Sequence, residues 1–78
     1  MVIFSQERGQ IVNSELTQRF WVVEDPNNST DWYLGCDIIG FQNNGCKLGT
    51  YPDEETAAKE LDRLFYALTS NEDTFFVS

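Results

Sequence analysis

Carboxylates are the most numerous side chains in this sequence that are capable of chemistry. Thirteen Asp and Glu residues stand against five Lys and Arg residues, which gives a net charge of −8. Two closely spaced pairs, Asp25 with Asp31 and Asp53 with Glu55, have the side-chain type that holds a divalent cation or transfers a proton. Neither pair lies in an EF-hand loop or beside a phosphate-binding glycine loop. We therefore expect no metal site, no cofactor and no catalytic residue.

Nucleophilic catalysis and zinc binding are excluded by the residue types that this chain lacks. It contains no histidine, so a Ser-His-Asp or Cys-His system cannot be assembled within it. A structural zinc site needs about four Cys or His ligands, and only two cysteines are present. The sequence therefore predicts a protein that is not an enzyme.

The two cysteines, Cys36 and Cys46, form one disulfide only if the strands that carry them place them side by side. Asn44-Gly45 is a strong signal for a type I′ hairpin turn, because both positions tolerate positive φ. In the resulting register Cys36 lies several residues along the strand from Cys46, beyond the roughly 7 Å that a disulfide spans between Cα atoms. We therefore expect free thiols, and a different register would reverse this expectation. The expected pairs are Asn43 with Cys46, Phe41 with Leu48, Ile39 with Thr50, and Ile38 with Tyr51.

The apolar pattern predicts a small α+β fold. The chain has 78 residues, so we expect a single domain of residues 1–78, and its 41% hydrophobic content is too high for a disordered acidic chain. Asp53 is the expected N-cap of one helix with an apolar stripe, and the strands precede it. This order favours an antiparallel meander of four to five strands with the C-terminal helix packed on one face. The expected strands are 1–5, 11–13, 16–24, 32–41, 46–51 and, at the end, 74–77.

One helix covers only one face of such a sheet, so the two faces have different expected roles. The covered face and the helix provide the expected core: Leu16, Phe20, Val22, Leu34, Cys36 and Ile38 against Leu61, Leu64, Phe65 and Leu68. The opposite face carries Trp21, Val23, Ile39, Phe41 and Leu48. An exposed apolar patch of this kind predicts a partner-binding surface, with Trp21 and Phe41 as its anchors. The alternative is that sheet twist or the Phe75-Phe76 segment covers this face within the molecule.

The acidic residues at the start of the helix, Asp53, Glu54 and Glu55, are the second expected partner-binding feature. Carboxylates spaced like phosphates imitate nucleic acid and occupy a basic cleft, whereas the simpler alternative is a solvated face that maintains solubility. The net negative charge argues against direct binding to nucleic acid or to anionic lipids. The sequence has no 18-residue apolar run and no basic N-terminal signal segment, which predicts a cytoplasmic protein without a membrane helix.

Two segments resemble a group of small proteins encoded by phages and prophages of Gram-positive bacteria. They are Val2-Ile3-Phe4-Ser5-Gln6 and Leu48-Gly49-Thr50-Tyr51, the latter followed by an acidic helix start and the residues 57–65. The likeness covers both ends of the chain and leaves 25–45 uncovered. Members usually carry Ser or Thr at the helix cap, where this chain has Asp53. The resemblance implies no activity, catalytic residue or cofactor, and it implies an accessory protein that binds and blocks a host protein.

We therefore expect a non-catalytic, acidic protein-interaction module. In this interpretation it is a phage-encoded inhibitor that binds a basic surface of a host nucleic-acid-handling or defence protein, in the cytoplasm of an infected or lysogenic bacterium. One alternative is a homo-oligomeric structural accessory protein, for example a homodimer that pairs its open sheet faces or edges. Another is a small-ligand sequestering domain with a groove between Trp32, Tyr33 and the helix.

Overall fold

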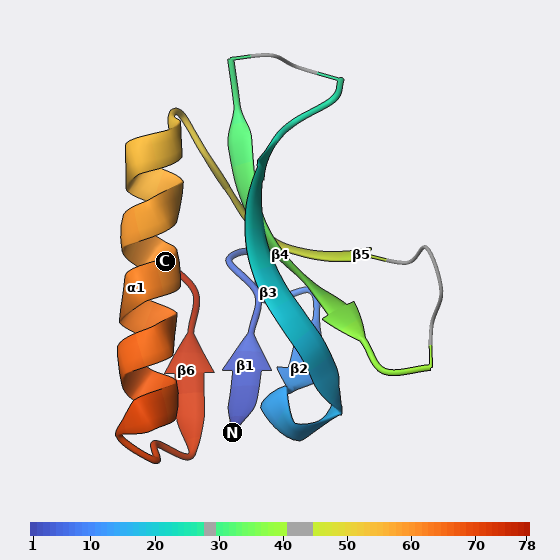
Figure 1. Ribbon diagram of the computed structural model, residues 1–78, viewed down its shortest axis with the longest axis vertical. Coiled ribbons are helices and arrows are strands. Elements are labelled where there is room, and N and C mark those ends of the chain that lie inside the picture. The colour runs from blue at the N-terminus through green and yellow to red at the C-terminus, as the bar shows by residue number, and fades with distance from the viewer. Residues whose placement is uncertain (28–29, 41–44) are drawn as a thin grey trace.

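The computed structural model describes residues 1–27, 30–40 and 45–78. It confirms an α+β fold with one C-terminal helix, but the predicted single sheet is wrong. The strands form two separate sheets of three, with the orders β2-β1-β6 and β3-β4-β5 (Figure 1). Along the chain the elements are β1 (Val2–Phe4), β2 (Ile11–Asn13), the 3₁₀ turn η1 (Ser14–Leu16), β3 (Thr17–Glu24), β4 (Trp32–Ile38), β5 (Gly45–Tyr51), α1 (Glu54–Thr69) and β6 (Thr74–Phe76).

The sheets separate at the turn between β2 and β3. There the Asn13 side chain accepts a hydrogen bond from the Glu15 backbone N–H at 2.9 Å, which caps η1 and redirects the chain. β1 consequently pairs antiparallel with β2 and parallel with β6, so the last strand of the chain lies beside the first. Alternation of apolar residues predicts that a segment is a strand but not which strand it pairs with, and for this reason the meander was the wrong topology.

The β3-β4-β5 sheet has a register different from the predicted one. Cys36 pairs directly with Cys46, and Gly45 lies within β5 opposite Asp37 rather than in a turn. The predicted pairs that involve Phe41 or Asn43, and the turn residue Asn44, fall outside the described residues. The expected separation of the two cysteines is therefore wrong, although both are free thiols.

A β-bulge in β5 explains the misplacement of Leu48. Leu34 pairs with Gly49 and Gly35 with Lys47, so Leu48 is an extra residue that breaks the alternation of β5. Its side chain is 1% exposed and lies in the core, which corrects the expectation that it belongs to the open face. Its carbonyl accepts a hydrogen bond from the Gln6 backbone N–H at 2.7 Å and so links the two sheets.

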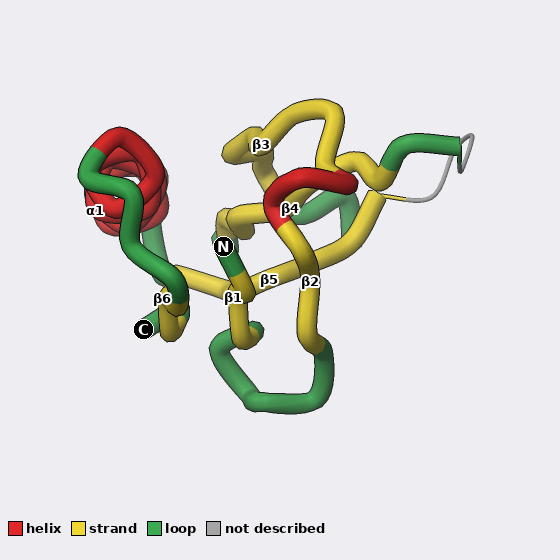
Figure 2. Tube along the Cα trace, turned by 90° about the horizontal axis from the view of Figure 1, so that it is seen from below, coloured by secondary structure: helices red, strands yellow, loops and turns green. Residues whose placement is uncertain are grey.

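The helix α1 begins and ends where its local sequence requires. Asp53 is the N-cap, as expected, and its carboxylate accepts a hydrogen bond from the Thr56 backbone N–H at 2.7 Å. After the last turn Asn71 adopts a φ of 57°, the left-handed conformation expected for this cap residue. The helix packs beside both sheets and contacts β3, β4 and β5 (Figure 2).

The core lies between the helix and the two sheets. The prediction is confirmed for Leu34, Cys36 and Leu64, whereas Leu16 and Phe65 are 57% and 63% exposed. Leu16 lies in η1 rather than in a strand. Phe65 lies on the margin of the helix's apolar stripe, so its ring is not fully covered by the sheets. Partly buried side chains that pack on the core include Phe20, Val22, Ile38, Leu61 and Leu68. The largest fully buried side chains are Ile3, Leu34, Leu48, Leu64, Val77 and Cys36.

Candidate functional site: an open aromatic face

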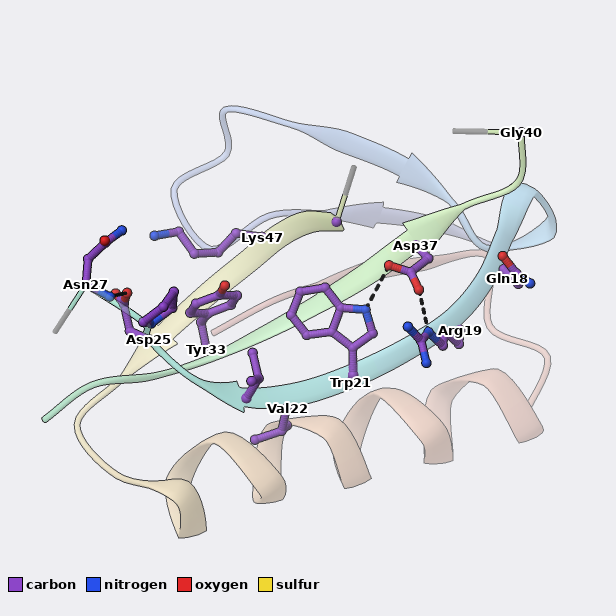
Figure 3. A pocket seen from close by; sticks show the side chains of 13 residues that line it. Gln18, Arg19, Trp21, Val22, Asp25, Asn27, Tyr33, Asp37, Gly40 and Lys47 are labelled. Atoms are coloured by element: carbon purple, nitrogen blue, oxygen red, sulfur yellow. Dashed lines mark hydrogen bonds and ion pairs between the residues drawn. The ribbon is translucent and has the colours of Figure 1, made fainter. Parts of the chain in front are cut away.

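One face of the β3-β4-β5 sheet is turned away from the helix. Trp21, Tyr33, Asp37 and Lys47 project from it, while α1 runs along the other side of β3 (Figure 3). Together with Arg19 these residues line a broad hollow of about 1180 Å³, which Asp25 and Asn27 border from the connection after β3. We call Arg19, Trp21, Tyr33, Asp37 and Lys47 the open face.

Two glycines hold the Trp21 side chain in place. Its indole ring lies over Gly35 of β4 and Gly45 of β5, so it spans the width of the sheet. A Cβ at Gly45 would come within 2.7 Å of Trp21 Cζ2, and a Cβ at Gly35 would clash with the same ring. Both positions therefore need glycine, because only a bare backbone leaves space for the ring.

Asp37 connects Trp21 to Arg19. The Trp21 Nε1–H donates to Asp37 Oδ1 at 3.1 Å, and the Arg19 Nε–H donates to Asp37 Oδ2 (Figure 3). The hydrogen bond from Arg19, followed by that from Trp21, lowers the pKa of the Asp37 carboxyl below its ordinary value. The carboxylate thus fixes the indole through its edge while the glycines fix it through its face.

Tyr33 and Lys47 complete the open face. The Tyr33 ring meets the Trp21 ring edge-on, with centroids 5.6 Å apart and planes at 64°. The Lys47 Nζ lies 5.3 Å from the centroid of the Tyr33 ring, which is cation–π distance. Trp32, the next residue along β4, packs instead on the core side. The predicted ligand groove between Trp32, Tyr33 and the helix is therefore wrong, because neighbouring residues of a strand point to opposite faces.

The structure brings together only some of the predicted apolar anchors. Trp21 is half-buried because its ring lies on Gly35 and Gly45. Val23, which is 40% exposed, is on the same strand. Ile39 is exposed just beyond the end of β4, and Phe41 lies outside the described residues. Sequence reasoning missed Asp37 and placed Tyr33 in a groove beside the helix, whereas both share the Trp21 side of β4 with Gly35. The available signal was the alternating pattern Tyr-x-Gly-x-Asp in β4 opposite a Trp in β3. This signal can be used only when the register of the two strands is known.

The alternative that the C-terminal segment covers the open face is wrong. Phe75 is 4% exposed and lies in the core of the other sheet. Phe76 stacks on Phe4, with ring centroids 4.8 Å apart, on the outer side of β1 and β6. Sheet twist does not enclose the face either, because Trp21, Tyr33 and Asp37 all retain exposed surface.

The predicted acidic residues at the helix start are exposed and lie at one end of the molecule. Asp53 is the N-cap of α1, and the hydrogen bonds that its carboxylate accepts from Thr56 lower the pKa of this carboxyl. Glu54 is exposed, and Glu55 forms a surface ion pair with Lys59 at 3.4 Å. The start of α1, the end of β3 and the start of β4 lie at the same end of the molecule (Figure 1), and the sequence has acidic residues in or beside each of these segments. This acidic end comprises Glu24, Asp25, Asp31, Asp53, Glu54 and Glu55.

A second, smaller hollow lies between β3 and the helix. It has a volume of about 490 Å³ and is mainly apolar, with Phe20, Leu61, Phe65 and Leu68 in its walls and Asp62 at its edge. The exposed ring of Phe65 belongs to it. Sequence reasoning assigned these side chains to the closed core and did not anticipate a hollow.

The carboxylate pairs considered for cation binding or proton transfer contact the backbone or a neighbouring side chain. Asp25 accepts a hydrogen bond from the Asn27 backbone N–H at 2.9 Å, and its own N–H donates to the Asp31 carbonyl at 2.9 Å. Within the described ranges, no group of three or more His, Cys, Asp or Glu side chains is placed to hold a metal ion. The open face combines an aromatic surface with paired charges.

Comparison with known proteins gives no relative. No family model, curated protein or solved structure matches this chain. Among the helical residues that the structure describes, none belongs to a helix long and apolar enough to cross a membrane.

Proposed function

We propose that this protein is a non-catalytic, acidic protein-interaction module that binds a basic surface of a partner protein. The open face provides the anchor and the acidic end directs the encounter. The observation that supports this function best is the fixed, half-exposed indole of Trp21 on a face that neither the helix nor the other sheet covers.

The fixed indole favours binding because its ordering is complete before a partner arrives. The Gly35 and Gly45 platform, the Asp37 carboxylate and the Tyr33 ring together leave Trp21 one orientation. A side chain that is already immobilised loses little rotamer entropy on association. Tryptophan is also among the residue types most enriched at interface hot spots.

The acidic end favours a basic partner. A net charge of −8, with acidic residues from two segments at one end, attracts a positively charged surface and repels nucleic acid. The resemblance to phage-encoded proteins leads us to propose a host nucleic-acid-handling or defence protein as that partner. In this proposal the carboxylates occupy positions that phosphates would otherwise take.

Capture from a bacterial lysate followed by binding kinetics with the captured partner tests the proposal. Trp21→Ala removes the anchor, so we expect the Kd to rise at least about tenfold, mainly through faster dissociation. The double variant Glu54→Lys/Glu55→Lys should slow association, and the wild-type on-rate should fall between about 50 mM and about 300 mM salt.

The matched control is Glu15→Lys/Glu72→Lys, which makes the same charge change at exposed positions in η1 and beyond the end of α1. It should leave the on-rate closer to wild type than the helix-start variant does. Capture of the same protein by all three variants with unchanged kinetics would show that the binding surface lies elsewhere.

A homo-oligomeric structural protein is the second candidate, supported by the hollow between β3 and α1. β3 is at the edge of its sheet and pairs only with β4 within the described part of the chain. The exposed Phe65 beside it offers apolar surface to a second copy. Light scattering at micromolar concentration should then give a dimer that Phe65→Ser dissociates, whereas a wild-type monomer would rule this function out.

A further inference from the structure

The two cysteines are placed to react with each other. Cys36 and Cys46 are directly opposite in the antiparallel pairing of β4 with β5. Opposite residues in such a pair have Cα atoms about 4.5–5.5 Å apart, inside the range of about 4.4–6.8 Å that disulfides span. Bond formation therefore needs no large movement of the backbone.

We propose that Cys36 and Cys46 form a redox modification site, which a low-molecular-weight disulfide such as oxidised glutathione converts into a cross-strand disulfide. The two thiols have different accessibility, which sets the order of events. Cys36 is 0% exposed, whereas Cys46 is half-buried and donates to Gln10 Oε1 at 3.0 Å near the surface. The reagent therefore reaches Cys46 first, and Cys36 is the resolving thiol.

The reaction consists of two thiol–disulfide exchanges. Cys46 loses its proton, its thiolate attacks one sulfur of the reagent, and the first glutathione leaves and takes up a proton. Cys36 then loses its proton and attacks the Cys46 sulfur, which releases and protonates the second glutathione. Two protein thiols are oxidised to one disulfide, while one molecule of oxidised glutathione is reduced to two of the thiol form.

Burial makes Cys36 less reactive than Cys46 toward a reagent that arrives from solvent. Burial is the largest cause that raises the pKa of the Cys36 thiol to about 12, and the negative charge of Cys46 is the next. In the mixed disulfide the Cys46 sulfur carries no charge, so this second cause disappears before Cys36 must act. The buried thiol is thus protected from direct oxidation, and its position opposite Cys46 lets it reach the adduct.

The disulfide should stabilise the β4-β5 hairpin. It closes a short loop between the two strands and removes conformational freedom from the unfolded chain. For a domain of this size we expect the Tm to rise by about 10 °C on oxidation and to return on addition of a dithiol reductant.

Intact mass measured after incubation with oxidised glutathione tests the proposal. The folded wild-type protein should lose two hydrogen atoms and become inert to alkylation after denaturation. Cys36→Ser should stop at a stable glutathione adduct on Cys46, and Cys46→Ser should remain unmodified while folded. These outcomes are independent of whether the open face binds a partner.

Three results would overturn the proposal. The first is a wild-type protein that accumulates the same persistent adduct as Cys36→Ser, because this would show that Cys36 cannot reach Cys46. The second is equal adduct formation by the two single variants, because it would remove the difference in accessibility. A wild-type protein that is oxidised only after unfolding in urea would likewise show that the folded strands do not bring the thiols together.

Discussion

Two arginine–carboxylate pairs in this protein have opposite surroundings. Glu60 and Arg63 belong to the helix, and their side chains are 8% and 48% exposed. Asp37 and Arg19 belong to the open face, and their side chains are 23% and 72% exposed. Each carboxylate also accepts a hydrogen bond from a third group, so the number of partners does not distinguish the pairs. The difference lies in the third group. For Glu60 it is the backbone N–H of Ser78 at the end of the chain, and for Asp37 it is the Trp21 indole on an accessible surface.

The Glu60–Arg63 pair fastens the end of the chain to the helix. Glu60 accepts from Arg63 Nε and Nη2 at 2.8 and 2.7 Å and from the Ser78 backbone N–H at 2.6 Å. Arg63 also donates to the Phe76 carbonyl at 2.7 Å, and the Tyr51 hydroxyl donates to the Ser78 carbonyl at 2.8 Å. The hydrogen bonds to Glu60 raise the pKa of Arg63 above its ordinary value. These contacts connect α1, β5 and the segment after β6, so the pair is structural.

The Asp37–Arg19 pair fixes a side chain that is available to other molecules. Its third partner is the Trp21 indole, and Arg19 remains mostly in solvent. An exposed ion pair contributes little to stability. Its main effect is therefore on the orientation of Trp21, which is the property that a binding surface requires.

Among changes at the two ion pairs and the open face, removal of the buried carboxylate should have the largest effect on stability. We expect Glu60→Ala to lower the free energy of unfolding by about 2–3 kcal/mol, because it leaves the Ser78 N–H without its acceptor and the partly buried guanidinium without its carboxylate. Urea denaturation measures the change. The matched control Glu55→Ala removes an exposed ion pair from the same helix and should change it by less than about 0.5 kcal/mol. Equal losses for both variants would contradict the structural role of Glu60.

The glycine platform provides the next prediction. Gly35→Ala should lower the free energy of unfolding by about 1–3 kcal/mol, because the new methyl group displaces the Trp21 ring. NMR should show a moved Trp21 Nε1–H signal, and binding of a partner should weaken. At Gly9 a Cβ would meet nothing within 4 Å, so Gly9→Ala is the control and should leave this signal in place. An unmoved Trp21 signal in Gly35→Ala would show that the ring does not rest on this glycine.

A smaller effect should follow the protonation of Asp37. Since folding lowers the pKa of this carboxyl, its contribution to stability is present above the ordinary value of 3.8 and is lost as the pH falls below it. The Trp21 Nε1–H signal should therefore titrate with a midpoint below 3.8, because its acceptor loses charge. Asp37→Asn should abolish this titration, and the Trp32 indole signal serves as the internal reference. A midpoint at or above the ordinary value would contradict the interaction with Arg19.

The smallest effect on stability should come from the hollow beside β3. Phe65 is 63% exposed, so Phe65→Ser should change the free energy of unfolding by less than about 0.5 kcal/mol. Leu64→Ala, at the adjacent fully buried position, should instead cost about 2–5 kcal/mol. Urea denaturation of the two variants under the same conditions measures both, and similar losses would show that Phe65 is part of the core.

Local features of the fold were predictable from the sequence. The Asp53 cap and the helical apolar spacing depend on residues within a few positions of one another, and both are confirmed. The strands are confirmed for the same reason, with small differences in their bounds. Their division into two sheets was not predictable, because it depends on contacts between β1 and β6 at opposite ends of the chain.

The site was only partly predictable because it depends on register. Trp21 follows from simple alternation on β3, whereas Asp37 and the two glycines meet it only in the observed pairing of three strands. Leu48 was misassigned because a bulge changes the parity of β5. The role of Glu60 was not predictable, because it accepts the Ser78 N–H, whose position no helical pattern reveals.

The parallel pairing of β1 with β6 also constrains how the protein folds as it is synthesised. β1 is completed early, but its second neighbour comes from residues 74–76. Until these residues leave the ribosome, one edge of β1 has no strand to pair with, and the apolar side chain of Ile3 lacks part of its covering. We expect the β1–β2 hairpin to become stable only when the rest of the chain is present, so that docking of β6 is the late, rate-limiting step of folding.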